Sequence, residues 1–402
     1  MTINAGLISL GGYLPAKMMP ESQKKRLVHF LKSDTLLPVE YIDHIGLTGR
    51  LPGNIETNDD GWRNQPWFGA WLKNLPKSKQ REPFQGTKER RRVPFDPRSR
   101  RESLIPHPML PSDAETIAAA LAIIQSEVSK DEIELLLVHS QIPDLPLPSN
   151  ASLVQHKLKL DNAGAYSVDS CCSSFVTMLE IASSLIMAGM RNTILIVCSY
   201  IDSHVIDRST YYSVNTGDAA AAAIVSRVPN GFGYICSAST SHGDRHKGII
   251  LQRRPPKLLQ KTSLGGDHLQ EYTTFYDLGA CREISSNAER DMVEVVQKAL
   301  AKTDLTIGDV DFFVTHQPVA WAAKAWRQAL GIAEDQSYDS FEAYGNIATC
   351  SVPVNLLEAG EKNLIKAGDR LLLASSGAGE NHIAVLERVS PQLVNSIRTA
   401  RE

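Results

Sequence analysis

The sequence lacks the features that would assign the chain to several specialised classes. It has no apolar run long enough to cross a bilayer, and it does not begin with the basic and then apolar pattern of a signal peptide. Its net charge is −3 over 402 residues, so no overall positive charge attracts nucleic acid or a membrane surface. These absences favour a cytoplasmic protein with no nucleic-acid or membrane partner.

Cysteine is also scarce, and its six positions form no regular pattern. They are residues 171, 172, 198, 236, 281 and 350, and no two of them make a C-x-x-C pair. A disulfide scaffold and a zinc site are therefore not indicated, and we expect neither a metal nor a resident cofactor. With 43% hydrophobic and 22% charged residues, the composition is that of a globular chain with enough material for a large core.

Apolar strands alternate with helices from Pro111 onward. The predicted strands cover residues 132–139, 193–199 and 219–225, and a helix is expected over residues 114–127. Strands that are apolar throughout are typical of sheets covered on both faces, so the pattern predicts an α/β fold. Residues 50–112 differ, because they are rich in Pro, Gly, Asn and Arg and read as a long loop or insertion.

The two halves of the chain repeat one plan. Residues 131–140 match residues 308–317 position for position at an offset of 177, and residues 195–197 fall on residues 372–374 at the same offset. Each half places a helix, an acidic turn and an apolar strand that ends in histidine in the same order. We interpret this as two fused copies of one α/β unit, divided near residues 228–231.

Two adjacent cysteines lie in the stretch from Tyr166 to Gly189. A short predicted strand (165–168) precedes them, and a helix of almost entirely small or apolar residues follows, which indicates a buried helix. Cys172 would then lie at the helix N-terminus, where peptide dipoles lower the pKa of a thiol. The alternative is that Cys171 and Cys172 are small core residues, since free cysteine is often buried.

Two further candidates follow predicted strands in the second half. His316 ends the strand 310–315, and Asn346 follows Ala343-Tyr-Gly345. Catalytic groups in α/β folds gather at the carboxyl ends of strands, and a thiolate, an imidazole and an amide together suit thioester chemistry. Alternatively, His316 is a structural strand-end histidine, as His139 would be in the other half, and Asn346 only makes a turn.

Five ordered segments resemble the signature segments of the thiolase superfamily, and most of all those of the β-ketoacyl-acyl carrier protein synthase III group. The resemblance implies a five-layered αβαβα fold built from two duplicated halves. Residues 1–229 would carry the nucleophilic cysteine, residues 230–402 the histidine and asparagine, and about residues 45–80 would be inserted. The segments are Val168–Phe175, Asn215–Ala222, Val314–Pro318, Tyr344–Pro353 and Ser375–Gly379.

The resemblance assigns roles to individual residues. Cys172 rather than Cys171 would be the nucleophile, with His316 and Asn346 as its catalytic partners. The backbone N–H groups of Cys172 and Ala378 would form the oxyanion hole. This set implies a ketosynthase III-like enzyme that joins two acyl thioesters by Claisen condensation. Transfer of the acyl group to a hydroxyl or amine is one alternative, and an inactive partner subunit of a heterodimer is another.

The chain departs from the group where the primer enzyme contacts coenzyme A. The corresponding positions hold Gln80, Phe84, Val319 and Trp321. These differences favour a donor bound to acyl carrier protein through its phosphopantetheine, although coenzyme A stays an option. They also suggest a role in secondary metabolism, such as polyketide or fatty-acid-derived products, and the resemblance implies a homodimer. The candidate carrier contacts at the tunnel mouth are Lys88, Arg90, Lys324 and Arg327.

Overall fold

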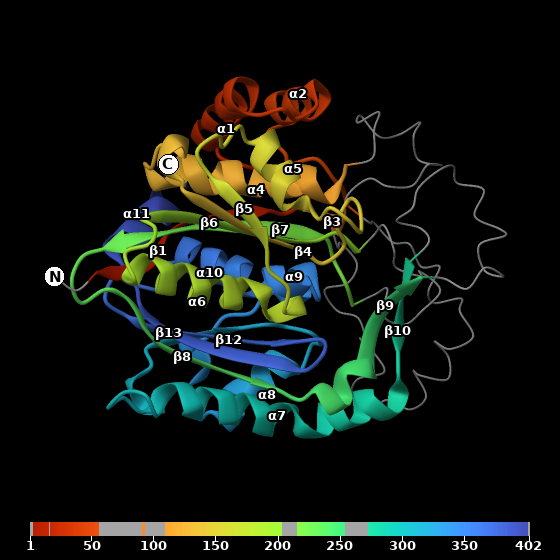
Figure 1. The fold of residues 1–402 in the computed structure, drawn as a ribbon, viewed down its shortest axis with the longest axis vertical. Coiled ribbons are helices and arrows are strands. Elements are labelled where there is room, and N and C mark those ends of the chain that lie inside the picture. Colours follow the sequence, from red (N-terminus) through yellow and green to blue (C-terminus); the bar gives the residue numbers. More distant parts are fainter. Residues whose placement is uncertain are drawn as a thin grey trace.

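Two β-sheets with helices between and outside them make up the described part of the chain (Figure 1). The computed structural model describes residues 3–15, 17–55, 91–92, 109–202, 215–253 and 272–400. Among the helices in these ranges, none combines the length and the apolarity needed to cross a membrane.

The first sheet has the strand order β1-β7-β6-β4-β5. β7 runs antiparallel to both β1 and β6, whereas β6, β4 and β5 are mutually parallel. The strands are β1 (Asn4–Tyr13), β4 (Leu135–Ser140), β5 (Gly164–Ser167), β6 (Thr193–Tyr200) and β7 (Ala219–Val228). The helices of this half are α1 (Glu21–Asp34), α2 (Val39–Thr48), α4 (Pro111–Ser126), α5 (Asn150–Lys157) and α6 (Ser174–Met187).

The second sheet has the order β11-β12-β13-β8, with β11 and β12 parallel and the other pairs antiparallel. Its strands are β8 (Gly233–Ser241), β11 (Phe312–Thr315), β12 (Arg370–Gly377) and β13 (Asn381–Arg388). The helices are α7 (Leu278–Leu300), α8 (Ala322–Ala329), α9 (Phe341–Tyr344), α10 (Ser351–Glu361) and α11 (Pro391–Thr399). Two short ribbons complete the strands: β2 (Asn54–Ile55) with β3 (Arg91–Arg92), and β9 (Ile249–Arg253) with β10 (Tyr272–Tyr276).

Three apolar cores separate five layers of secondary structure. One core packs α1, α2, α4 and α5 on the outer face of the first sheet. The second fills the space between the two sheets around α6 and α10, and the third lies between the second sheet and α7 and α8. The layers are visible in Figure 1 from α4 to α7. The predicted five-layered αβαβα fold is therefore confirmed.

The duplication extends beyond the strands that the sequence identified. Five elements of the second half begin 177 residues after their counterparts. The pairs are β4 and β11, α6 and α10, β6 and β12, and the single turns Lys130–Glu132 with Ile307–Asp309 and Cys171–Ser173 with Ala348–Cys350. The proposed boundary between residues 229 and 230 falls between β7 and β8 and stays a prediction.

The predicted insertion over residues 45–80 is described only in part. Residues 45–48 form the last turn of α2, where Ile45 is fully buried, and the description continues to residue 55. Residues 56–80, Lys88 and Arg90 lie outside the described residues. The predicted helix 114–127 is α4, which begins three residues earlier because Pro111 suits the first helical turn.

Candidate active site

Cys172 lies in a single 3-10 turn (Cys171–Ser173) between β5 and the start of α6. Cys171 has a φ of 56°, a left-handed conformation that is uncommon for a residue with a side chain. This backbone turn is held from the other half of the chain, because the Ser375 hydroxyl donates to the carbonyl of Cys172 at 3.0 Å. The end of β12 thus lies directly against the turn that carries Cys172.

The two adjacent thiols influence each other. Hydrogen bonding and proximity to Cys171, together with burial, raise the pKa of Cys172, while the backbone N–H groups of Ala378 and of Cys172 oppose that rise. Gln141 Nε2 donates to the Cys171 sulfur at 3.1 Å. Whichever thiol ionises first therefore raises the pKa of the other. The sequence-based expectation that the helix N-terminus alone would lower the pKa of Cys172 is wrong, because it omitted burial and the neighbouring thiol.

The hydrogen bond from Ala378 identifies where negative charge on the sulfur is stabilised. The same two backbone N–H groups, those of Cys172 and Ala378, were predicted as the oxyanion hole. Gly377 permits this arrangement because a Cβ at that position would lie 2.3 Å from the carbonyl oxygen of Ser170 and 2.8 Å from Ser173 Oγ. Close backbone approach at this glycine sets the position of the Ala378 amide.

His316 follows β11 and is almost completely buried. Its backbone N–H donates to the carbonyl of Ala374 on β12 at 3.2 Å, which fixes the strand end. Burial lowers the pKa of His316 to about 3, with partial compensation from a hydrogen bond to the backbone of Ala348, so the ring is neutral. Ser351 Oγ lies 3.1 Å from Nδ1, and the tautomer of the ring decides which of the two atoms is the donor.

Asn346 is oriented by contacts on both sides. Its Oδ1 accepts the N–H of Ala348 at 2.8 Å, which directs the Nδ2 group away from that backbone. Its own N–H donates to the carbonyl of Asn215 at 2.6 Å, and its carbonyl accepts the N–H of Gly217 at 3.1 Å. The Asn215–Ala222 segment of the first half therefore positions Asn346 of the second half.

One cavity of about 390 Å³ joins these groups. Cys172, His316, Asn346 and Ala378 all line it, so the structure brings the three predicted catalytic side chains and one predicted oxyanion-hole residue together. Much of the remaining wall is apolar and comes from β9, α7 and the segment after His316. These residues are Ile249, Leu251, Ile284, Ala288, Pro318, Val319, Trp321, Ala322 and Trp326.

Sequence reasoning missed most of this apolar wall. The residues from β9 and α7 have no motif, and the amphipathic pattern of α7 does not distinguish a cavity wall from an ordinary core face. Lys324 and Arg327, predicted at the tunnel mouth, line a separate cavity of about 350 Å³. Arg327 donates to the carbonyl of Ile332 and is largely buried, whereas Lys324 is exposed.

Family models and protein relatives with similar sequences all identify one family. Residues 166–243 match the family model described as 3-oxoacyl-[acyl-carrier-protein (ACP)] synthase III, and residues 300–389 match the model of its C-terminal part. The chain is 32% identical over 266 residues to a β-ketoacyl-[acyl-carrier-protein] synthase III of Natranaerobius thermophilus, covering 65% of this chain and 79% of that relative. It is 28% identical to the Clostridium novyi protein of the same name, over 83% of this chain and 94% of the relative.

Solved structures show the same fold. The 3-oxoacyl-[acyl-carrier-protein] synthase III of Aquifex aeolicus superposes with a TM-score of 0.67 at 23% identity, covering 96% of this chain and 99% of that one. A priming β-ketosynthase from a polyketide biosynthetic pathway gives a TM-score of 0.67 at 19% identity, over 97% and 98% of the two chains. OleA of Xanthomonas campestris gives 0.66 at 20% identity, over 96% and 99%.

Proposed function

The chain belongs to the 3-oxoacyl-[acyl-carrier-protein] synthase III family of condensing enzymes in the thiolase superfamily, and from this premise we propose that it joins two acyl thioesters through an acyl intermediate on Cys172. One observation carries the proposal: Cys172, His316, Asn346 and Ala378 line the same cavity. A nucleophile, two hydrogen-bond donors for an enolate and a backbone amide for a tetrahedral oxyanion are what this chemistry requires.

In the first half-reaction, the Cys172 thiolate attacks the carbonyl carbon of a donor thioester. The oxyanion of the tetrahedral intermediate accepts hydrogen bonds from the backbone N–H groups of Cys172 and Ala378. Collapse of the intermediate breaks the bond to the donor sulfur, and the released thiol takes up the proton that Cys172 lost. The placement of the Ala378 amide beside the Cys172 sulfur supports this step.

In the second half-reaction, a malonyl-type thioester loses carbon dioxide, and the electron pair of the broken bond becomes an enolate. His316 Nε2–H and the Nδ2 group of Asn346 donate to the enolate oxygen. The low pKa of His316 keeps the ring neutral, and the N–H of a neutral imidazole suits this role because it donates a hydrogen bond but is too weak an acid to transfer its proton fully to the enolate. Attack on the acyl carbonyl forms the carbon–carbon bond and releases the Cys172 thiolate.

We propose an acyl carrier protein as the donor and secondary metabolism as the setting. Val319 and Trp321 line the cavity where the family places an asparagine and an arginine that contact coenzyme A. Trp321 is 46% exposed and offers an apolar surface at the cavity. Of the predicted carrier contacts in the described residues, the exposed Lys324 is the better candidate for an acidic carrier helix, since Arg327 is committed to internal contacts.

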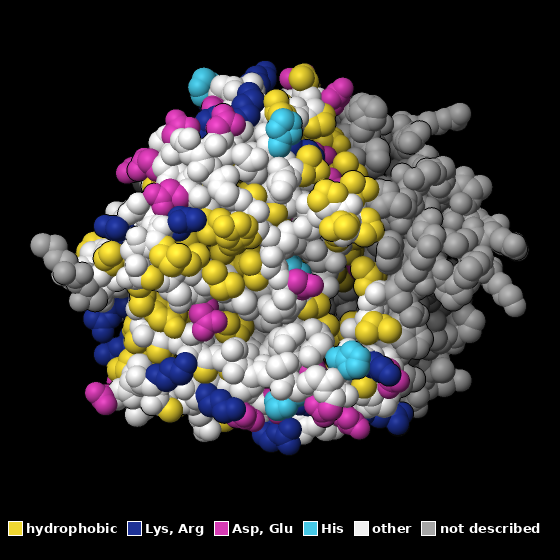
Figure 2. All heavy atoms as spheres, in the orientation of Figure 1, with side chains coloured by type: hydrophobic (Ala, Val, Ile, Leu, Met, Phe, Trp, Pro, Cys, Tyr) yellow, Lys and Arg dark blue, Asp and Glu magenta, His cyan; other side chains and the backbone are white. Residues whose placement is uncertain are grey.

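A homodimer is also part of the proposal. β5 is an edge strand of the first sheet, and within the described residues it pairs with β4 on one side only. Figure 2 shows apolar side chains gathered on the face that carries β5 and α6. The large exposed apolar residues are Tyr166 in β5, Met187 in α6 and Met190 just after α6, and the segment from β4 through α5 that precedes β5 adds Leu145, Leu147 and Leu153. Such a patch beside a free strand edge suits pairing with a second copy.

The proposed function is tested by supplying an acyl-carrier donor and a malonyl-carrier acceptor and identifying the product by mass spectrometry. The expected product is a β-keto thioester, formed by the wild type and not by Cys172→Ala. His316→Ala should still gain the acyl mass but form little product. An ester or amide product would instead support acyl transfer to a hydroxyl or amine, and a chain that gains no acyl mass from any donor would support an inactive partner subunit.

A further inference from the structure

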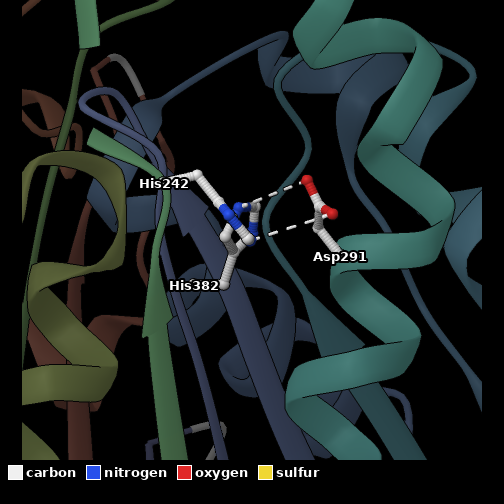
Figure 3. Close-up of side chains that lie close together, drawn as sticks. All are labelled: His242, Asp291 and His382. Carbon is white, nitrogen blue, oxygen red and sulfur yellow. Dashed lines mark ion pairs between the residues drawn. The ribbon is translucent and has the colours of Figure 1, made fainter. Parts of the chain in front are cut away.

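Two histidines and an aspartate from three separate segments converge beside the catalytic cavity. His242 follows the end of β8, Asp291 lies in α7, and His382 lies in β13. The potential ligand atoms of the three residues lie within 4.8 Å of one another. Figure 3 shows both imidazole rings facing the Asp291 carboxylate, with His242 Nε2 3.8 Å from Oδ1 and His382 Nε2 4.0 Å from Oδ2.

The two imidazole nitrogens that face the carboxylate are buried and lack hydrogen-bond partners. His242 Nε2 and His382 Nε2 have almost no solvent contact, and neither makes a hydrogen bond, whereas Asp291 Oδ2 has Arg245 as an ion-pair partner at 2.8 Å. His382 and Asp291 are 3% and 1% exposed as residues. Native proteins rarely bury polar atoms without partners. Two such nitrogens directed at one buried carboxylate indicate that something absent from the polypeptide completes the cluster.

The surrounding charges favour a cation there. Arg245 Nη2 lies 2.8 Å from Asp291 Oδ2, although not in hydrogen-bond geometry, and Arg245 Nη1 lies 3.6 Å from Glu380. Asp291, Glu380 and Arg245 are all buried, so the cluster holds one excess negative charge when both imidazoles are neutral. The exposed Arg290 also contacts Asp291, through Oδ1, where solvent screens its charge.

Two arginines hold the Asp291 carboxylate in place. Arg245 Nη2 lies 2.8 Å from Oδ2, and Arg290 Nη2 donates to Oδ1 at 2.9 Å. Groups of this kind around a coordinating carboxylate orient it toward the metal.

We propose that His242, Asp291 and His382 form a binding site for a divalent transition metal, with Zn²⁺ as the best match. Two imidazole nitrogens and one carboxylate oxygen are a ligand set that Zn²⁺ accepts in tetrahedral geometry. The separations of 3.8 Å to Oδ1 and 4.0 Å to Oδ2, and the bound of 4.8 Å on all three pairs, exceed the roughly 3.4 Å between tetrahedral ligands, so side-chain rotations would bring both imidazole nitrogens toward one carboxylate oxygen when the metal binds. Glu380, whose Oε2 lies 3.5 Å from His382 Nε2, or a water would fill the fourth position.

The site would act on the structure rather than in the chemistry. It would join β8, α7 and β13, and His382 and Glu380 also line the catalytic cavity. Glu380 comes two residues after the amide-donating Ala378, in the turn between β12 and β13. A metal at this point would therefore fix the turn that carries the oxyanion-hole amide. No short motif of closely spaced ligands in the sequence indicates this site, because His242, Asp291 and His382 are far apart along the chain.

The test is Co²⁺ and Zn²⁺ binding to the full chain in a Cys172→Ala background, which removes the catalytic thiol as a competing ligand. We expect one equivalent of Co²⁺ with the strong visible absorption of four-coordinate nitrogen and oxygen ligation and no sulfur charge-transfer band. His242→Gln and His382→Gln should each weaken binding by about 10²-fold or more. His246→Gln is the matched control, since His246 is exposed in the Gly243–Gly248 turn that directly follows His242.

Folding and binding are kept separate in this experiment. Far-ultraviolet circular dichroism establishes that each variant is folded, and His242→Gln carries least risk because its side chain is 27% exposed. Zn²⁺ should raise the unfolding midpoint of the parent and of His246→Gln but not of His382→Gln. A folded parent that binds neither metal, or ligand variants that bind as tightly as the control, would overturn the proposal. Neither result would bear on acyl loading, which the metal site does not explain.

Discussion

Substituting Gly377 by alanine tests whether close backbone approach builds the oxyanion hole. The added Cβ would lie 2.3 Å from the Ser170 carbonyl oxygen, 2.8 Å from Ser173 Oγ and 3.1 Å from the backbone nitrogen of Ser173. Comfortable carbon–oxygen contacts need more than about 3 Å, so β12 and the Cys171–Ser173 turn must separate by roughly 1 Å. The backbone at Gly377 is not in a left-handed conformation, so the effect would be steric and not conformational.

That displacement moves the Ala378 amide away from the developing oxyanion. Loss of one oxyanion-hole donor lowers rates by about 10²–10³-fold, and a misplacement of about 1 Å by about 10²-fold. We therefore expect Gly377→Ala to slow acyl loading of Cys172 about 10²-fold, together with an overpacking cost of roughly 1–3 kcal/mol in the free energy of unfolding.

The assay is the rate of acyl-mass gain, measured well below the unfolding midpoint of the variant. Gly243→Ala is the control, because a Cβ there meets no atom within 4 Å and the backbone is not left-handed. It should load at the wild-type rate. A folded Gly377→Ala protein that loads as fast as Gly243→Ala would refute the argument that this contact positions the amide.

Three further substitutions test other parts of the site and the fold. Cys171→Ala should lower the pKa of Cys172, because the neighbouring thiol raises it, and the pH profile of alkylation by iodoacetamide should move to lower pH. Ser351→Ala should slow condensation roughly 5-fold, because it removes a hydrogen bond to His316 that is worth about 1 kcal/mol. Product assays measure this rate, and mass spectrometry should show unchanged acyl loading of Cys172. Burial raises the pKa of Glu387 to about 8 from 4.5. The folded state therefore keeps a proton that the unfolded chain releases, and stability falls as pH rises from about 4.5 to about 8. Urea unfolding at several pH values should show that Glu387→Gln removes most of this fall; an unchanged profile would contradict the assignment.

The fold could be predicted because its signals are local and repeated. Strands β4 and β11 both begin with an apolar run, and the same offset relates β6 to β12, so the duplicated plan can be recognised in the amino-acid sequence alone. The predicted catalytic side chains follow from chain position as well. His316 directly follows the parallel strand β11, and Cys172 lies in the turn just before the buried helix α6, and such ends meet in a two-sheet fold.

What the sequence could not reveal depends on distances between remote segments. The pKa of Cys172 reflects burial and an adjacent thiol, neither of which a helix-terminus argument weighs. His242, Asp291 and His382 are far apart along the chain, and only the packing of α7 on the second sheet brings them together. Arg327 looked like an accessible cation in the sequence, yet its guanidinium is used within the fold.

The most direct test of the account is the site at which the acyl group becomes attached. The protein is incubated with an acyl-carrier donor and digested, and the acylated cysteine is located by peptide mass spectrometry in the wild type, Cys171→Ala and Cys172→Ala. The account predicts an acyl mass on residue 172 in the first two proteins and none in the third. An acyl group on Cys171, or undiminished labelling of Cys172→Ala, would contradict it.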